Sequence, residues 1–131
     1  MGWKVRAIRG ATTATDNTRE AITEAVTELL DRLEQHNQLD PEEIISVVFT
    51  TTKDLDAIFP AAIARHRPFW DNIALLDVQQ MHVENDLERC IRVLIHLNVP
   101  SPDLKLTNVY LRHAENLRPD WSLSSSSSHS S

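Results

Sequence analysis

The stretch RAIRGATT at residues 6–13 decides how the N-terminal part of this 131-residue chain folds, and it ends in an unusual way. Leading into this stretch, every second residue is apolar, as on one buried face of a β-strand. These residues are Trp3, Val5 and Ala7. The next residue of that parity is Arg9, followed by Gly10, the only glycine beyond position 2. The pattern predicts a strand whose apolar face finishes in an arginine, beside the one point where another group can approach the backbone closely.

The remaining elements predict one α+β domain. Asn17 or Thr18 can cap a helix that runs to about Gln35. Its apolar stripe consists of Ile22, Ala25, Val26, Leu29, Leu30 and Leu33. A short helical turn begins at Pro41, and a second helix, within residues 54–66, is interrupted or starts at Pro60. Four further strands are expected at residues 44–52, 72–81, 89–99 and 106–113. This order predicts a mixed sheet with the helices on one face.

Composition favours a single small domain followed by a tail. Residues 1–123 form the predicted domain, whereas residues 124–131, SSSSSHSS, cannot bury enough apolar surface to order themselves and are expected to be flexible. Nineteen acidic against thirteen basic residues give a net charge of −6, which argues against nucleic-acid binding. No signal peptide or membrane-spanning apolar run is seen, so we expect a cytoplasmic protein without membrane contact.

The sequence contains no motif for the common catalytic chemistries. Its six histidines lack metal-binding spacing, and neither a nucleophile elbow nor a nucleotide-binding glycine loop occurs. If the protein is an enzyme, its reaction is therefore expected to need neither a nucleophile nor a metal.

Polar side chains at strand positions are the remaining candidates. Arg92 lies within the apolar run CIRVLI, where an unpaired guanidinium is costly. It can pair with an internal acid such as Asp77 or Glu88, face solvent, or bind a ligand. Tyr110 in the last strand and Phe59 before the second helix also fit core positions.

Several motifs, in order along the chain, resemble one family. They are IRGATT near the N-terminus, DLDAIFPAAIAR at residues 54–65, QQMHV followed by RCIRVLI, and VYLRHAENLRPD near the C-terminus. Over about residues 3–123 they resemble the monofunctional chorismate mutases of the non-helical, trimeric class. The resemblance implies an α+β subunit whose sheet packs with two others into a barrel-like homotrimer, with active sites at the subunit interfaces. It also implies the intramolecular Claisen rearrangement of chorismate to prephenate, without a cofactor, on the route to phenylalanine and tyrosine.

The resemblance also assigns roles to particular residues. Arg92 would donate to the breaking ether oxygen and to a carboxylate of the substrate, while Arg9 and Tyr110 would bind carboxylates. The other implied substrate-binding residues are Phe59, Arg65 and Leu117, and Arg118, which starts a C-terminal segment that helps close the site.

Two positions depart from the family pattern. Gln80 stands where the family usually has a glutamate that accepts a hydrogen bond from the ring hydroxyl of the substrate, and Asp77 stands where cysteine is common. We predict that Asp77 has taken over this contact. The exchange requires an irregular or terminating strand around Val78 and Gln79, because residues three apart in a regular strand face opposite sides. Otherwise Gln80 alone contacts the hydroxyl.

The sequence is also compatible with a second function that involves no catalysis. A trimeric module of the same fold could bind a small anion without turnover, because a fold by itself does not fix a function. The joint presence of Arg9, Arg92 and Tyr110 favours the enzyme.

Overall fold

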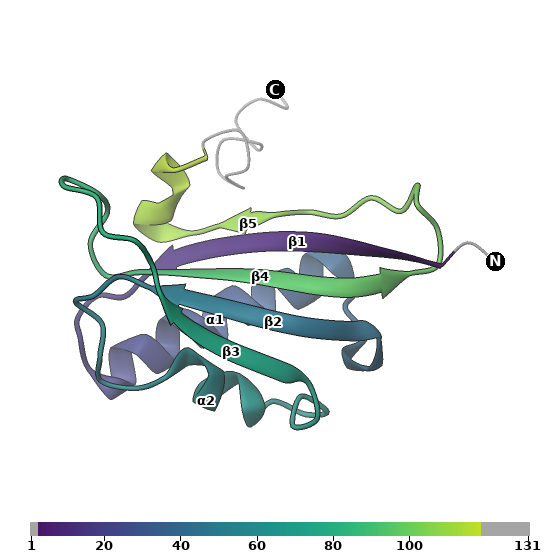
Figure 1. Ribbon diagram of the computed structural model, residues 1–131, viewed down its shortest axis with the longest axis horizontal. Helices are drawn as coiled ribbons and strands as arrows, with labels where there is room; N and C mark the ends of the chain where they lie inside the picture. The colour runs from purple at the N-terminus through teal and green to yellow at the C-terminus, as the bar shows by residue number, and fades with distance from the viewer. Residues whose placement is uncertain (1–2, 119–131) are drawn as a thin grey trace.

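A computed structural model describes residues 3–118, which form a five-stranded sheet flanked by helices (Figure 1). The strands are β1 (Lys4–Thr13), β2 (Ile44–Thr51), β3 (Ala74–Gln79), β4 (Cys90–Val99) and β5 (Val109–Tyr110). Their order across the sheet is β3-β2-β4-β1-β5. β4 pairs antiparallel with both β1 and β2, whereas the edge strands β3 and β5 pair parallel with β2 and β1. The predicted mixed sheet is confirmed.

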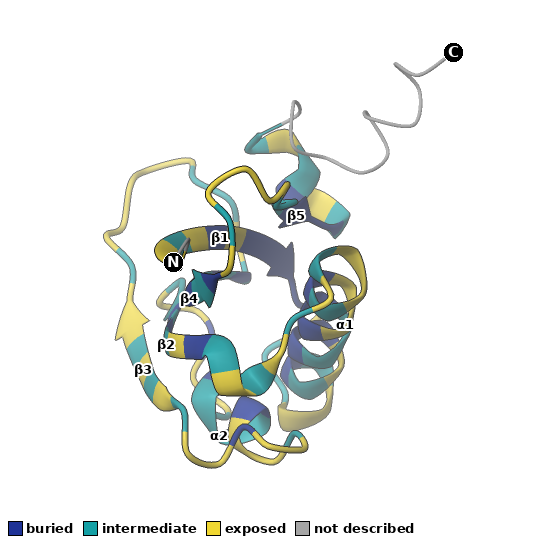
Figure 2. Cartoon of the chain, turned by 90° about the vertical axis from the view of Figure 1, so that its right-hand side faces the viewer, coloured by how far each residue is buried: buried dark blue, intermediate teal, exposed yellow. Residues whose placement is uncertain are grey.

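The α-helices lie on one face of this sheet (Figures 1 and 2). The helical elements are α1 (Arg19–Asn37), the 3₁₀ turn η1 (Pro41–Glu43), α2 (Pro60–Arg65) and the 3₁₀ turn η2 (Arg112–Asn116). Thr18 caps α1, because its hydroxyl oxygen accepts a hydrogen bond from the Ala21 amide at 3.1 Å. All six residues of the predicted apolar stripe of α1 are buried. The second helix starts at Pro60, where the fixed φ of proline suits the first helical position.

The two faces of the sheet differ in what covers them. On the inner face, defined as the one packed against α1 and α2, the core includes Ile8, Phe49, Val93 and Ile95. Val5 and Ala7 lie instead on the opposite, outer face, and Trp3 and Val5 are 61% and 55% exposed. The prediction that this parity is buried is therefore wrong for the single chain. The reason is that α1 packs over the other parity, where Ile8, Gly10 and Thr12 are buried although the same face begins with Lys4 and Arg6.

The last strand is much shorter than predicted. Only Val109–Tyr110 pairs with β1, in place of residues 106–113. Just before it, the side chain of Asn108 meets β1, because its Oδ1 accepts a hydrogen bond from the Arg9 amide at 2.8 Å. Just after it, Arg112 adopts a left-handed φ of 54°, and the chain turns into η2. The hydrogen bond of the Asn108 side chain before β5 and the turn at Arg112 after it therefore limit β5 to two residues.

Gly10 lies where α1 and β5 come closest to β1. A Cβ atom at this position would lie 3.0 Å from Leu33 Cδ1, 3.1 Å from Leu29 Cδ1 and 3.2 Å from the carbonyl oxygen of Val109. The close approach that the glycine permits is thus an internal packing contact.

We expect Gly10→Ala to lower the free energy of unfolding by about 1 kcal/mol, because the crowding outweighs the entropy that alanine removes from the unfolded chain. Urea denaturation at a fixed protein concentration measures this change. A variant as stable as the wild type would show that α1 moves aside at no cost.

Candidate functional site

Arg9, Arg92 and Tyr110 lie on the outer face of the sheet. The register fixes their positions, since Ala11 of β1 is opposite Arg92 of β4 and beside Tyr110 of β5. Arg9 precedes Ala11 by two residues and therefore shares its face. Arg9 and Arg92 line one pocket of about 340 Å³, together with Thr50 of β2. Residues far apart in the sequence are thus brought to a single place.

Tyr110 is buried at the edge of this group. Its ring packs in a small cluster with Ala11 and Ala114, and Leu87 and Leu117 pack against the same cluster. Arg118 follows as the last described residue and is half-buried. The expected tail at residues 124–131 lies outside the described residues.

Unpartnered polar atoms gather around Arg92. Within residues 3–118, four buried side-chain atoms have no hydrogen-bond partner, and three of them are Arg92 Nε, Thr50 Oγ1 and Gln80 Oε1. Thr50 is the register partner of Arg92, and Gln80 directly follows β3, with its amide donating to the Thr51 carbonyl oxygen at 2.9 Å. A buried polar group without a partner costs about 1–3 kcal/mol, so such a cluster indicates a place where a polar ligand binds.

Arg92 does not pair with either acid that the sequence suggested. Its Nη2 lies 4.0 Å from Oδ2 of Asp86, in the loop between β3 and β4, while Glu88 pairs with Arg89 at 3.4 Å. The Arg92 side chain is 30% exposed. The contact with Asp86 is long, and the buried Nε has no partner within residues 3–118, so Arg92 forms only a weak ion pair within one chain. Sequence reasoning missed Asp86, because this residue belongs to no motif and only the path of its loop brings it close to Arg92.

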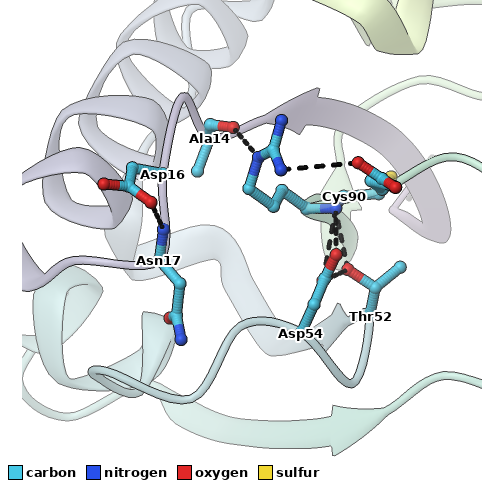
Figure 3. A network of polar contacts seen from close by, with 8 residues as sticks. Ala14, Asp16, Asn17, Thr52, Asp54 and Cys90 are labelled. Carbon is cyan, nitrogen blue, oxygen red and sulfur yellow. Dashed lines mark hydrogen bonds and ion pairs between the residues drawn. The ribbon is translucent and has the colours of Figure 1, made fainter.

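A polar network fixes the start of β4 (Figure 3). The Arg89 amide donates to both carboxylate oxygens of Asp54, at 3.2 and 3.0 Å, and the Cys90 amide donates to the Thr52 hydroxyl at 3.0 Å. Arg89 Nε donates to the carbonyl oxygen of Ala14 at 3.1 Å. These hydrogen bonds tie together the ends of β1 and β2 and the start of β4. They thereby fix the beginning of the strand that carries Arg92.

Asp77 points away from Arg92. β3 is regular as far as Gln79, and Asp77 is paired with the buried Phe49 of β2, so its carboxylate lies on the inner face. Asp77 Oδ1 accepts a hydrogen bond at 3.0 Å from the amide of Ala61, in the first turn of α2. β3 ends at Gln79, as the exchange required, but Asp77 lies in the regular part of the strand and stays on the face opposite Arg92. Within one chain, Asp77 caps α2.

A second group of predicted site residues surrounds α2. Phe59 is 70% exposed and lines a pocket of about 570 Å³ with Ala62 and Asp77. Arg65, the last residue of α2, is exposed. Since Asp77 and Arg92 lie on opposite faces of the sheet, one chain presents the predicted site residues as two separate groups.

The described part of the chain has no feature typical of a metal site or a membrane span. Across residues 3–118, no three His, Cys, Asp or Glu side chains gather so that they could hold a metal ion. No helix in that range combines the length and the apolar character that crossing a bilayer demands. The candidate site consists of hydrogen-bonding side chains on an apolar surface.

We expect Asp77→Ala to lower the free energy of unfolding by about 1 kcal/mol, because α2 loses its side-chain cap. Burial raises the pKa of Asp77, and the hydrogen bond from Ala61 lowers it by less. The folded chain therefore binds this proton more tightly than the unfolded chain, so the wild type gains stability as pH falls through the raised pKa.

Asp77→Asn keeps an acceptor for the Ala61 amide and should lose this pH-dependent gain. Urea denaturation of the wild type and both variants, from neutral pH down to about pH 4, measures both effects. An Asp77→Ala variant with wild-type stability would contradict the capping role.

Comparison with known proteins identifies the family. Residues 5–121 match the family model for chorismate mutase type I. The chain is 35% identical over 119 residues to chorismate mutase AroH of Bacillus subtilis, covering 91% of this chain and 94% of that protein. It is 42% identical over 121 residues to chorismate mutase AroH of Thermus thermophilus, covering 88% and 95%. A solved chorismate mutase from Clostridium thermocellum superposes with a TM-score of 0.80 at 42% identity, over 85% of this chain and 98% of that one. The chain belongs to the chorismate mutase type I family.

Proposed function

We propose that this protein converts chorismate to prephenate on the outer face of its sheet. The observation that carries the proposal is the state of Arg92, whose buried Nε has no partner within the described chain although it lies in an apolar strand. The relatives named above are chorismate mutases, which favours turnover over the alternative of a binding module.

The reaction breaks an ether bond while a carbon–carbon bond forms within the same molecule. Negative charge grows on the ether oxygen as its bond breaks, and Arg92 donates a hydrogen bond to that oxygen. This contact strengthens toward the transition state, so it accelerates the reaction rather than merely binding the substrate. Arg9 and Tyr110 bind carboxylates and hold the flexible substrate in its reactive, chair-like arrangement. The planar fork of arginine matches a carboxylate in geometry.

The complete site is shared between two chains of a homotrimer. The outer-face group of one chain faces the α2 group of the next, namely Phe59, Arg65 and Asp77. Exposed apolar residues on the outer face, including Val5, Leu76 and Val78, support burial of this face in an assembly. A head-to-tail contact between identical chains uses two different surfaces and can close into a ring.

The other contacts with the substrate are also divided between the two chains. Gln80 lies on the side of Arg92 and contacts the ring hydroxyl of the substrate, whereas Asp77 reaches the site only from the neighbouring chain. Leu117 and Arg118 lie near Tyr110 at the C-terminal side of the site. The domain boundary at residue 123 and the cytoplasmic location stay predictions.

We expect Arg92→Ala to lower kcat by at least ~10²–10³-fold, the effect of losing one donor to a developing oxyanion. The variant should still fold, because the partner of the guanidinium is the substrate rather than a buried acid. Arg92→Lys should also be impaired, since it keeps the charge and loses the fork.

Loss of chorismate absorbance in the ultraviolet measures the rate, and circular dichroism checks the fold. Arg32→Ala, which removes an exposed arginine of α1, is the matched control and should behave as the wild type. An Arg92→Ala variant that is fully active would contradict the mechanism. A variant that unfolds would assign Arg92 to a structural ion pair.

A further inference from the structure

Asp86 lies between two side chains of the candidate site. Its Oδ2 accepts a hydrogen bond from Gln80 Nε2 at 3.4 Å and lies 4.0 Å from Arg92 Nη2. The sequence suggested no role for it, and the mechanism above does not use it. Its carboxylate is nevertheless the one acidic group that the described ion pairs place beside Arg92.

The position of Asp86 is fixed by the loop around it. Its Oδ1 accepts a hydrogen bond from the Leu87 amide at 2.8 Å, and its own amide donates to the Val83 carbonyl oxygen at 3.0 Å. Leu87 packs against the cluster that contains Tyr110. These contacts fix the backbone of Asp86, and its second oxygen, Oδ2, is left to face the site.

This carboxylate determines which way the Gln80 amide faces. An ionised carboxylate only accepts hydrogen bonds, whereas a side-chain amide has one accepting and one donating end. The donating end of Gln80 must therefore face Asp86, and the carbonyl Oε1 is left pointing elsewhere. Oε1 is buried and has no partner within residues 3–118, and the same is true of Arg92 Nε and Thr50 Oγ1. The amide thus offers an acceptor to whatever binds beside Arg92.

We propose that Asp86 is a positioning residue that holds Gln80 with Oε1 facing the substrate, where it accepts the hydrogen bond of the ring hydroxyl. This inference rests on the proposed function, because it takes chorismate as the ligand. The charge of Asp86 also polarises the amide through the Nε2 hydrogen bond, which makes Oε1 a stronger acceptor. Gln80 and Asp86 together do what a single carboxylate at position 80 would do.

The test is a double-mutant cycle at positions 80 and 86. Asp86→Asn should lower kcat/KM about tenfold, because an amide at position 86 can donate as well as accept and no longer fixes Gln80. Gln80→Glu alone should also lower kcat/KM about tenfold, because it places two carboxylates in hydrogen-bond contact and they repel each other.

The double variant reverses the roles of the two positions. The carboxylate introduced at position 80 accepts from the substrate hydroxyl, and the amide introduced at position 86 donates to that carboxylate. We expect kcat/KM within about threefold of the wild type, where independent effects would multiply to a loss of about a hundredfold. Recovery in the Asp86→Asn background would also show that loss of folding does not explain the single variant.

Three outcomes overturn the inference while the proposed function stands. They are an Asp86→Asn variant with wild-type kinetics, a double variant that retains the multiplied loss, and an equal loss in Glu84→Gln. Glu84→Gln removes one exposed carboxylate from the same loop and should leave kcat/KM unchanged. If instead the wild-type protein fails to accelerate chorismate loss, the proposed function fails, so the two failures are distinguishable.

Discussion

The position of β4 between β1 and β2 is the constraint on which the site depends. β4 pairs over its whole length with β1, and its residues of one parity, Ile91, Val93, Ile95 and Leu97, are buried. Alternation then forces Arg92 onto the opposite face, beside Thr50 of β2 and diagonally across from Arg9 of β1. A shift of one residue in this register would move Arg92 into the helix-covered core, where an unpaired guanidinium is far too costly. The register of β4 that buries the core residues is therefore the same register that places Arg92 in the site.

The single chain has two unfavourable features on the same face of its sheet. Its outer face holds exposed apolar side chains that water solvates poorly, and near Arg92 it holds buried polar atoms without partners. In the proposed assembly, a second chain packed against this face would cover the apolar surface, and an anionic substrate would supply partners for the polar atoms. The proposed shared site would explain how a protein with a net charge of −6 binds a dicarboxylate, because its arginines would act locally in a space that a neighbouring chain shields from solvent.

Much of the fold and part of the site followed from the sequence. The stripe of α1 was confirmed residue by residue, and the mixed sheet with its helices on one face was also confirmed, because strong periodicity and capping residues are local signals. The predicted buried face of β1 was wrong, because the position of α1, which the strand pattern does not encode, buries Ile8, Gly10 and Thr12 instead. β5 was overextended, because the side chain of Asn108 takes the place of a backbone pair. Asp86 was missed altogether, because it reaches Arg92 through the path of a loop that no local pattern encodes.

The claim that the site is assembled from two chains can be tested by mixing inactive variants. One chain carries Arg92→Ala, and the other carries Phe59→Ala with Arg65→Ala, so each is damaged in a different half of the site. Each should be nearly inactive alone, and refolding the two together should restore about a quarter of the wild-type rate, because random mixing leaves one interface in four with both halves intact. A mixture no more active than its two components would show that each site lies within a single chain, and would contradict this account.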